Sequence, residues 1–156
     1  MLKRQLKYNL IKFLRLHGAP SKLALGFAVG ATVNFYPTFG FGVALAGVLA
    51  ALFFSNIPAG LLGDIIFKPL FPLFFYLNLI TGHFVWTNRI HGFDHLWSQV
   101  INPGIDTVAE IGRLFFTGAL INSLILGTLL YVTVFVVVKR YRRRALQWLV
   151  ARNRRQ

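Results

Sequence analysis

Two oppositely charged residues, Asp64 and Lys68, are isolated inside the longest apolar part of this chain. They are the only charged residues between Lys22 and Arg89, and they are four positions apart. On a helix this spacing places both side chains on one face, where they can pair. A charge inside a membrane is costly and usually pairs or faces water. Two interpretations are open: a polar site for a lipid headgroup or a coupling proton, or a lysine that marks the cytoplasmic end of the segment and is neutralised by Asp64.

Other polar or helix-breaking residues accompany this pair. Backbone N–H groups at the starts of broken helices can receive an anionic group. Asn34 could equally serve a hydrogen bond between helices. Two arginines flank a more polar stretch and could either receive a lipid phosphate or anchor helix ends. The predicted substrate-binding set is Asn34, Pro37, Gly40, Asn56, Asp64, Lys68, Pro69, Arg89 and Arg113.

A metal site and catalytic chemistry are not predicted. His91 and His95 have a spacing that can bind a metal on a helix, but Gly92 weakens that helix and no third ligand is evident. No Ser-His-Asp order, phosphate-binding loop, dinucleotide turn or pair of catalytic carboxylates stands out. We therefore expect no cofactor and no enzymatic activity.

The elements that position these residues are those of a membrane protein. Residues 114–138 contain no charge, and the basic run Lys139–Arg144 follows at once. About 20 apolar residues suffice for a helix to cross the hydrocarbon core, and basic flanks stay in the cytoplasm. Overall, 56% of residues are hydrophobic and 13% are charged, against about 25% charged in soluble domains.

The net charge of +13 is concentrated at the two ends. Residues 1–22 and 139–156 contain basic groups and no acid. This distribution favours cytoplasmic termini and attraction to anionic lipids over nucleic-acid binding. With no cysteine, disulfides and thiolate metal sites are excluded, and no cleavable signal peptide is expected.

The first half of the chain is predicted to form two units. Residues 1–17 read as an amphipathic basic helix, either at the membrane interface or packed on the protein. Residues 23–54 form two short apolar runs interrupted at Pro37, which predicts a re-entrant hairpin, with one long kinked helix as the alternative. Such a break must be covered by other helices. Small residues should permit this close packing: Gly26, Gly30, Gly42, Ala46 and Ala50.

The second half carries the predicted crossings. Residues 57–86 form a segment broken at Lys68–Pro69, read either as a second hairpin or as a broken span. Residues 89–113 form an outer interfacial segment, and Asp106 is placed to cap the following helix. The transmembrane helix is expected at 114–138 and the basic cytoplasmic tail at 139–156.

Several short motifs within residues 21–82 resemble a bacterial family called domain of unknown function twenty sixty-two. The matching stretches are Ala24–Gly30, Phe35–Gly40, Asn56–Gly63 and the break at Pro69–Pro72; the family usually has Asn-Pro where this chain has Lys68–Pro69. The resemblance implies an inner-membrane protein without a settled activity. At the level of architecture the paired broken segments look like the DedA/VTT group, which is associated with moving lipids or polyprenyl phosphates between leaflets.

Together these features predict an all-α, multi-pass protein of the bacterial inner membrane with both termini in the cytoplasm. Its expected role is transporter-like or lipid-handling, for an anionic lipid or a polyprenyl phosphate. The alternative is a non-catalytic scaffold of the cell envelope. Expected partners are membrane lipids, anionic ones above all, and a second copy of the chain that could cover a polar interior.

Overall fold

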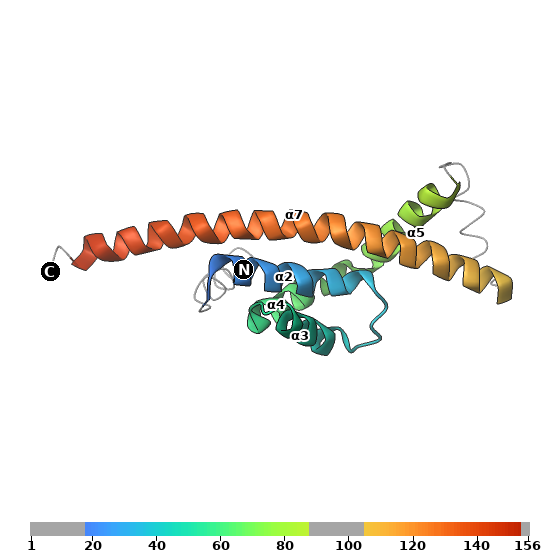
Figure 1. The fold of residues 1–156 in the computed structure, drawn as a ribbon, viewed down its shortest axis with the longest axis horizontal. Helices are drawn as coiled ribbons and strands as arrows, with labels where there is room; N and C mark the ends of the chain where they lie inside the picture. Colours follow the sequence, from blue (N-terminus) through green and yellow to red (C-terminus); the bar gives the residue numbers. More distant parts are fainter. Residues whose placement is uncertain (1–17, 88–104, 154–156) are drawn as a thin grey trace.

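The computed structural model describes residues 18–87 and 105–153. Every element in these ranges is a helix, as the all-α prediction requires (Figure 1). The α-helices are α2 (Pro20–Thr32), α3 (Gly42–Leu52), α4 (Ile57–Phe67), α5 (Phe71–Thr87) and α7 (Ile105–Asn153), and two 3-10 turns are η1 (Val33–Phe35) and η2 (Lys68–Leu70). The helix predicted at 1–17 and most of the outer segment predicted at 89–113 lie outside the described residues.

Helix α7 is the long element against which α2 and α5 pack (Figure 1). Val138 near its basic end packs against Leu23 at the start of α2, whereas Gly127 faces Thr32 at the end of α2. Helix α2 therefore runs antiparallel to α7. Helix α5 is antiparallel to α7 as well, because Gly82 lies against the Leu114 backbone and Asn78 against Gly118.

Small residues allow α2, α3 and α4 to pack at backbone distance. A Cβ added to Gly30 would overlap the carbonyl oxygen of Gly60, and one added to Gly26 would overlap that of Asn56. On α3, Ala46 and Ala50 are fully buried. The prediction that small side chains let neighbouring helices cover the first broken unit is confirmed for these residues, as expected for helices that associate through close contact.

The interruption at Pro37 separates two helices, which rules out one long kinked helix. The backbone N–H of Phe41 donates to the carbonyl of Thr38 over 2.8 Å. The two residues between them have positive φ, 45° at Phe39 and 95° at Gly40. Positive φ at both central positions is the geometry of a type I′ turn. The chain therefore reverses tightly between α2 and α3.

The interruption at Pro69 has a different form. Helix α4 passes through η2 into α5, and the linking residues stay in the right-handed helical region, with φ −54° and ψ −41° at Lys68 and φ −50° and ψ −44° at Phe71. Residues 57–87 thus form one bent helical segment and not a hairpin. Of the two alternatives for this segment, the structure agrees with the broken span.

Helix α7 is much longer than the predicted span at 114–138. It comprises 49 residues, from Ile105 to Asn153. It already begins at Ile105, so Asp106, predicted to cap this helix, lies within its first turn instead, and Val138 does not end it. The basic residues that end the apolar stretch are good helix formers, and no proline occurs between 105 and 153. A change in hydropathy was therefore a poor guide to the end of the helix.

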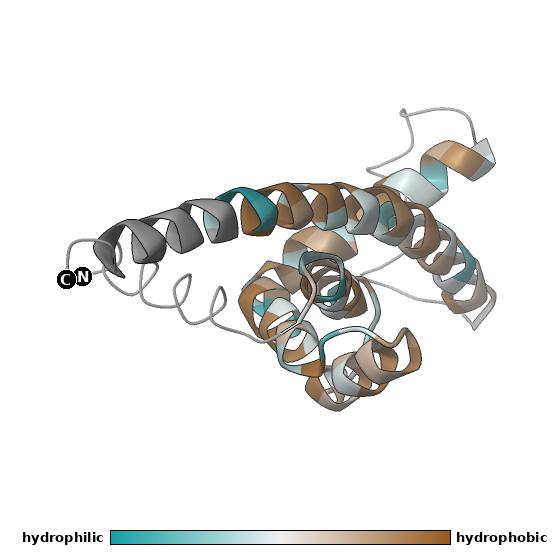
Figure 2. Cartoon of the chain, turned by 60° about the vertical axis from the view of Figure 1, so that its left-hand side comes forward, coloured by the Kyte–Doolittle hydropathy of each residue, from teal (hydrophilic) through white to brown (hydrophobic). Residues whose placement is uncertain are grey.

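Within the described residues, two helical segments are long and apolar enough to cross a membrane, Ile57–Trp86 and Ile111–Tyr141. In the most apolar stretch of each segment, only 22% and 11%, respectively, is buried within the molecule. A core helix of a soluble protein would be mostly buried. Figure 2 shows the apolar colour along the middle of α7, ending in a hydrophilic band where the basic residues begin. Exposed apolar area on this scale marks a surface that meets lipid or protein.

Candidate functional site

The break between α2 and α3 is tied to the neighbouring helix α4 through Asn34. Its side-chain amide donates to the main-chain carbonyl of Asp64 over 3.1 Å and to that of Ala31 over 3.3 Å. Asn34 is 5% exposed. Because α2 and α4 run parallel, this contact brings the two broken segments together at the same end of the α2–α4 unit.

The next two residues tie the same break to α5 and α7. The carbonyl of Phe35 accepts a hydrogen bond of 2.8 Å from the Asn78 side chain, and the Tyr36 hydroxyl lies 3.2 Å from the Ser123 hydroxyl. A carbonyl released where a helix stops needs a partner when no water is available. The surrounding helices provide these partners, so the break is covered by protein on this side.

Asp64 is the most unusual group at this junction. Its side chain is 1% exposed, and neither carboxylate oxygen has a hydrogen-bond partner among the described residues. The Lys68 ammonium lies 3.8 Å from Oδ2, too far for a hydrogen bond, and the lysine side chain is 47% exposed. A buried carboxylate with only a distant counter-ion is energetically costly.

The start of α3 lies beside this carboxylate. A Cβ built on Gly42 would lie 3.1 Å from Asp64 Oδ1 and 2.9 Å from Thr38 Oγ1. The carboxylate therefore occupies the space beside the first residue of α3, a helix that has no side-chain N-cap. The unpaired N–H groups of a helix start carry partial positive charge, which favours an anion there.

This arrangement can perform two kinds of chemistry. Asp64 can take up a proton or a small cation, because its oxygens have no other partner among the described residues. Lys68 can bind an anion such as a phosphate, because about half of its side chain is exposed. The two are coupled through the ion pair: a proton on Asp64 would release Lys68 for an external anion.

Lys68 does not lie at the same end of the fold as Lys22. The backbone N–H of Asn56, just before α4, donates to the carbonyl of Lys22, whereas Lys68 follows the other end of α4. The alternative in which Lys68 marks the cytoplasmic end of the apolar segment therefore conflicts with the fold, if Lys22 marks that end.

Of four other predicted site residues, two lie in the breaks, one lies at the exposed tip of the turn and one lies at the opposite end of α4. Pro37 and Pro69 lie within the two breaks, close in sequence to Asn34 and Lys68 respectively. Gly40 is exposed at the tip of the turn, with nothing within 4 Å of an added Cβ. Asn56 was expected to join Asp64, but it caps the opposite end of α4, where its side chain accepts the Ala59 N–H over 3.0 Å. Its role there is capping.

The sequence matches a known family over most of its length. The family described as "Uncharacterized protein conserved in bacteria (DUF2062)" covers residues 3–147. This chain belongs to that family. The match extends well beyond residues 21–82, on which the resemblance was recognised, while similarity to the DedA/VTT group is not shown. No curated protein and no solved structure matches the chain.

In this DUF2062 chain, Arg113 lies far from the Asp64 junction. Its guanidinium stacks over the Trp86 ring at 4.1 Å, at the end of α5 remote from η2. Trp86 follows Phe71 by fifteen positions along α5, which corresponds to roughly 22 Å of helix. The structure thus pairs Arg113 with an aromatic ring and separates it from Asp64. Arg89, His91 and His95 lie outside the described residues.

A buried amide network between α5 and α7 was missed by the sequence analysis. Asn122 donates to the Asn78 side chain over 3.1 Å and accepts from the Thr81 hydroxyl over 3.1 Å. Asn78 is fully buried. A signal was present, because each asparagine is a lone amide in an apolar run and lies four residues from a glycine, Gly82 or Gly118. Small residues with interhelical amides are typical of packed membrane helices.

Proposed function

We propose that this chain is an integral protein of the bacterial inner membrane. It crosses the membrane through the two apolar segments Ile57–Trp86 and Ile111–Tyr141. The basic run after Val138 favours a cytoplasmic C-terminus. The antiparallel pairing of α5 with α7 fits one outward and one inward crossing, with the N-terminus in the cytoplasm too.

Pairings along α7 support a re-entrant path for α2 and α3. Leu23 packs beside Val138, next to the basic end, whereas Tyr36 reaches Ser123, fifteen residues earlier on α7. This separation is roughly 22 Å along the helix, compared with about 30 Å for the hydrocarbon core. The chain would enter from the cytoplasmic side, turn inside the membrane at Tyr36–Phe41, and return through α3.

The function that the geometry supports best is lipid handling: binding an anionic lipid or a polyprenyl phosphate and moving it between leaflets. One observation carries it. A buried carboxylate that accepts no hydrogen bond from any described residue lies beside a half-exposed lysine, where two broken segments meet inside a candidate span. Ionisable groups at such depth mark substrate or proton pathways, and paired broken segments point to transport sites.

In this mechanism Lys68 binds the phosphate and Asp64 controls its availability. When Asp64 is ionised, its negative charge attracts the Lys68 ammonium, which lies 3.8 Å from Oδ2. When Asp64 takes a proton, Lys68 is released to bind a phosphate oxygen at the break. No covalent bond changes, so the role is transport and not catalysis. The analogy with the DedA/VTT group concerns only the pattern of paired broken segments, and fold alone does not imply function.

The test is lipid exchange in vesicles that contain the purified full-length protein. Fluorescent phosphatidylglycerol in the inner leaflet should become accessible to a membrane-impermeant quencher faster than in empty vesicles. Lys68→Gln removes the group that binds the phosphate, and Asp64→Asn removes the charge that draws Lys68 back from the phosphate, so each should abolish the excess rate. Arg140→Gln, an exposed charge on α7 outside the junction, is the matched control and should retain it. Equal rates in protein-containing and empty vesicles for both phosphatidylglycerol and a polyprenyl phosphate contradict lipid handling.

A scaffold role is the second candidate, and the length of α7 favours it. The helix continues twelve residues beyond Tyr141 to Asn153, roughly 18 Å past the apolar segment. Such an extension could dock another envelope protein or a second copy of the chain. Deleting residues 142–156 should then remove copurifying partners while Asp64→Asn leaves them bound. Partners that stay bound after this deletion contradict the scaffold role.

A further inference from the structure

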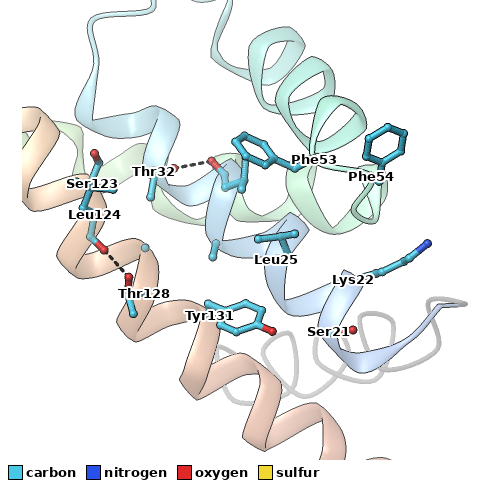
Figure 3. A pocket seen from close by; sticks show the side chains of 13 residues that line it. Ser21, Lys22, Leu25, Thr32, Phe53, Phe54, Ser123, Leu124, Thr128 and Tyr131 are labelled. Atoms are coloured by element: carbon cyan, nitrogen blue, oxygen red, sulfur yellow. Dashed lines mark hydrogen bonds between the residues drawn. The ribbon is translucent and has the colours of Figure 1, made fainter.

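A groove of about 610 Å³ follows the outward face of α2, away from the Asp64 junction. Leu25, Val29 and Thr32 form its floor, α7 forms one wall with Gly127 and Thr128, and the end of α3 forms the other with Phe53 (Figure 3). The groove is open on one side, toward the surroundings of the helices.

The interior of the groove is apolar despite the hydroxyl groups that line it. The Thr32 hydroxyl donates to the Val29 carbonyl and the Thr128 hydroxyl to the Leu124 carbonyl, each over 2.8 Å (Figure 3). Their hydrogen-bonding needs are therefore met within their own helices. A polar ligand would gain little there, whereas an aliphatic chain would bury apolar surface.

One end of the groove is polar and positively charged. Ser21 and Lys22 are exposed in the first turn of α2, and the Tyr131 ring extends from α7 toward Ser21 (Figure 3). The first turn has no acidic residue, and no side chain caps it. A cation at the positive end of a helix is unfavourable. An anion at this position would satisfy the lysine and the helix start together.

We propose, relying on the inner-membrane placement given above, that this groove binds one anionic phospholipid of the cytoplasmic leaflet. One acyl chain lies along α2, and the phosphate is bound by Ser21, Lys22 and Tyr131. The polar end lies beside Leu23, which packs against Val138 next to the basic run of α7. This is the side on which anionic lipids and basic residues meet. The site is distinct from Asp64 and Lys68.

The experiment is a lipid titration of the full-length protein in a neutral detergent, followed by native mass spectrometry. Phosphatidylglycerol should bind one per chain, about tenfold more tightly than phosphatidylcholine, and Lys22→Gln should weaken it about fivefold. Lys139→Gln removes an equal charge from the same end without lining the groove, so it should have no such effect. Thr128→Trp should block binding of the acyl chain, whereas Leu129→Trp, at an exposed neighbour that does not line the groove, should not.

Two outcomes overturn the lipid site. Equal weakening by Lys22→Gln and Lys139→Gln would indicate a diffuse surface charge. Phosphatidylglycerol binding that is unchanged in Thr128→Trp and is competed by inorganic phosphate would indicate a site that binds only the phosphate and not an acyl chain. Circular dichroism and gel filtration identify any variant that fails to fold, and Val29→Trp then fills the groove from its floor. Asp64→Asn should leave this binding intact even where it abolishes lipid exchange, so the two proposals fail separately.

Discussion

The side-chain amide of Asn34 donates to the main-chain carbonyl of Asp64, and among the described residues no hydrogen bond meets the distance and angle requirements at its carboxylate. The hydrogen bond, 3.1 Å long, joins the break after α2 to the last turn of α4 through the backbone. The Asp64 side chain is left beside the start of α3, with Lys68 as its nearest counter-ion. The junction is therefore held together without using the carboxylate, which remains available for a ligand or a proton.

This geometry predicts unequal effects for substitutions at the ion pair. Lys68→Gln leaves an uncompensated buried carboxylate and should lower the free energy of unfolding by about 1–2 kcal/mol, less than for a fully buried pair because the lysine is half-exposed. Asp64→Asn removes the buried charge and should not destabilise. The double variant should recover the stability lost in Lys68→Gln. Thermal unfolding in one detergent measures all four proteins.

A double variant as unstable as Lys68→Gln alone would contradict this account. It would mean that the carboxylate has another partner, or that Lys68 acts through packing of its aliphatic stem. Arg140→Gln is the control for loss of a positive charge, because this exposed arginine lies outside the junction.

Much of this fold could be read from the spacing of apolar and small residues. Gly26 and Gly30 are four apart on one face, and the requirement for close contact follows from that spacing. The residues that these glycines contact could not be predicted from the sequence. The partner of Gly30 is Gly60, on α4, and only the parallel arrangement of α2 and α4 brings these two backbones together.

The candidate site was predictable only in part. Asp64 and Lys68 stood out because they are charged within an apolar stretch, and their contact follows from helical spacing. Asn56 was misplaced because the sequence does not show which end of α4 meets the first break; Asn56 is at the start of α4 and Asp64 near its end. Asn78 was not predicted as a site residue because it is uncharged, and the criterion that identified Asp64 and Lys68 was charge within an apolar stretch. Its partners come from η1 and α7, which are far apart in sequence.

The contact between Gly30 and Gly60 predicts strong sensitivity to a single methyl group. Gly30→Ala places a Cβ against the Gly60 backbone, which cannot yield as a flexible side chain would. We expect a loss of about 1–3 kcal/mol or more in the free energy of unfolding. Gly112→Ala is the matched control, since nothing lies within 4 Å of its added Cβ, and alanine favours a helix by about 1 kcal/mol.

Thermal unfolding in detergent compares the two alanine variants with the parent chain. Similar midpoints for Gly30→Ala and Gly112→Ala would show that α2 and α4 can separate without cost, and the close packing of this unit would have to be abandoned.

The amide of Asn78 should be worth more than an exposed hydrogen bond. Asn78→Leu keeps the number and branching of the side-chain heavy atoms but leaves the Phe35 carbonyl and the Asn122 amide without this partner. The expected cost is about 1–3 kcal/mol, toward the lower end because interhelical hydrogen bonds in membranes average below 1 kcal/mol. Thr117→Val, which removes hydrogen bonds at an exposed position, should change stability by about 0.5 kcal/mol or less. Equal effects of the two substitutions would refute the importance of the network.

The re-entrant path can be tested with two phenylalanines that match closely. Phe39 and Phe54 are 90% and 84% exposed and have similar positive φ, 45° and 49°. They lie just before and just after α3. The chain has no cysteine, so Phe39→Cys and Phe54→Cys each provide a single thiol without further engineering. A re-entrant hairpin places Phe54 at the cytoplasmic surface and Phe39 inside the hydrocarbon. An impermeant maleimide should therefore label Phe54→Cys in inverted membrane vesicles and Phe39→Cys from neither side until detergent is added. Labelling of Phe39→Cys in intact spheroplasts would show instead that α2 crosses the whole membrane, and the topology proposed for both breaks would then be wrong.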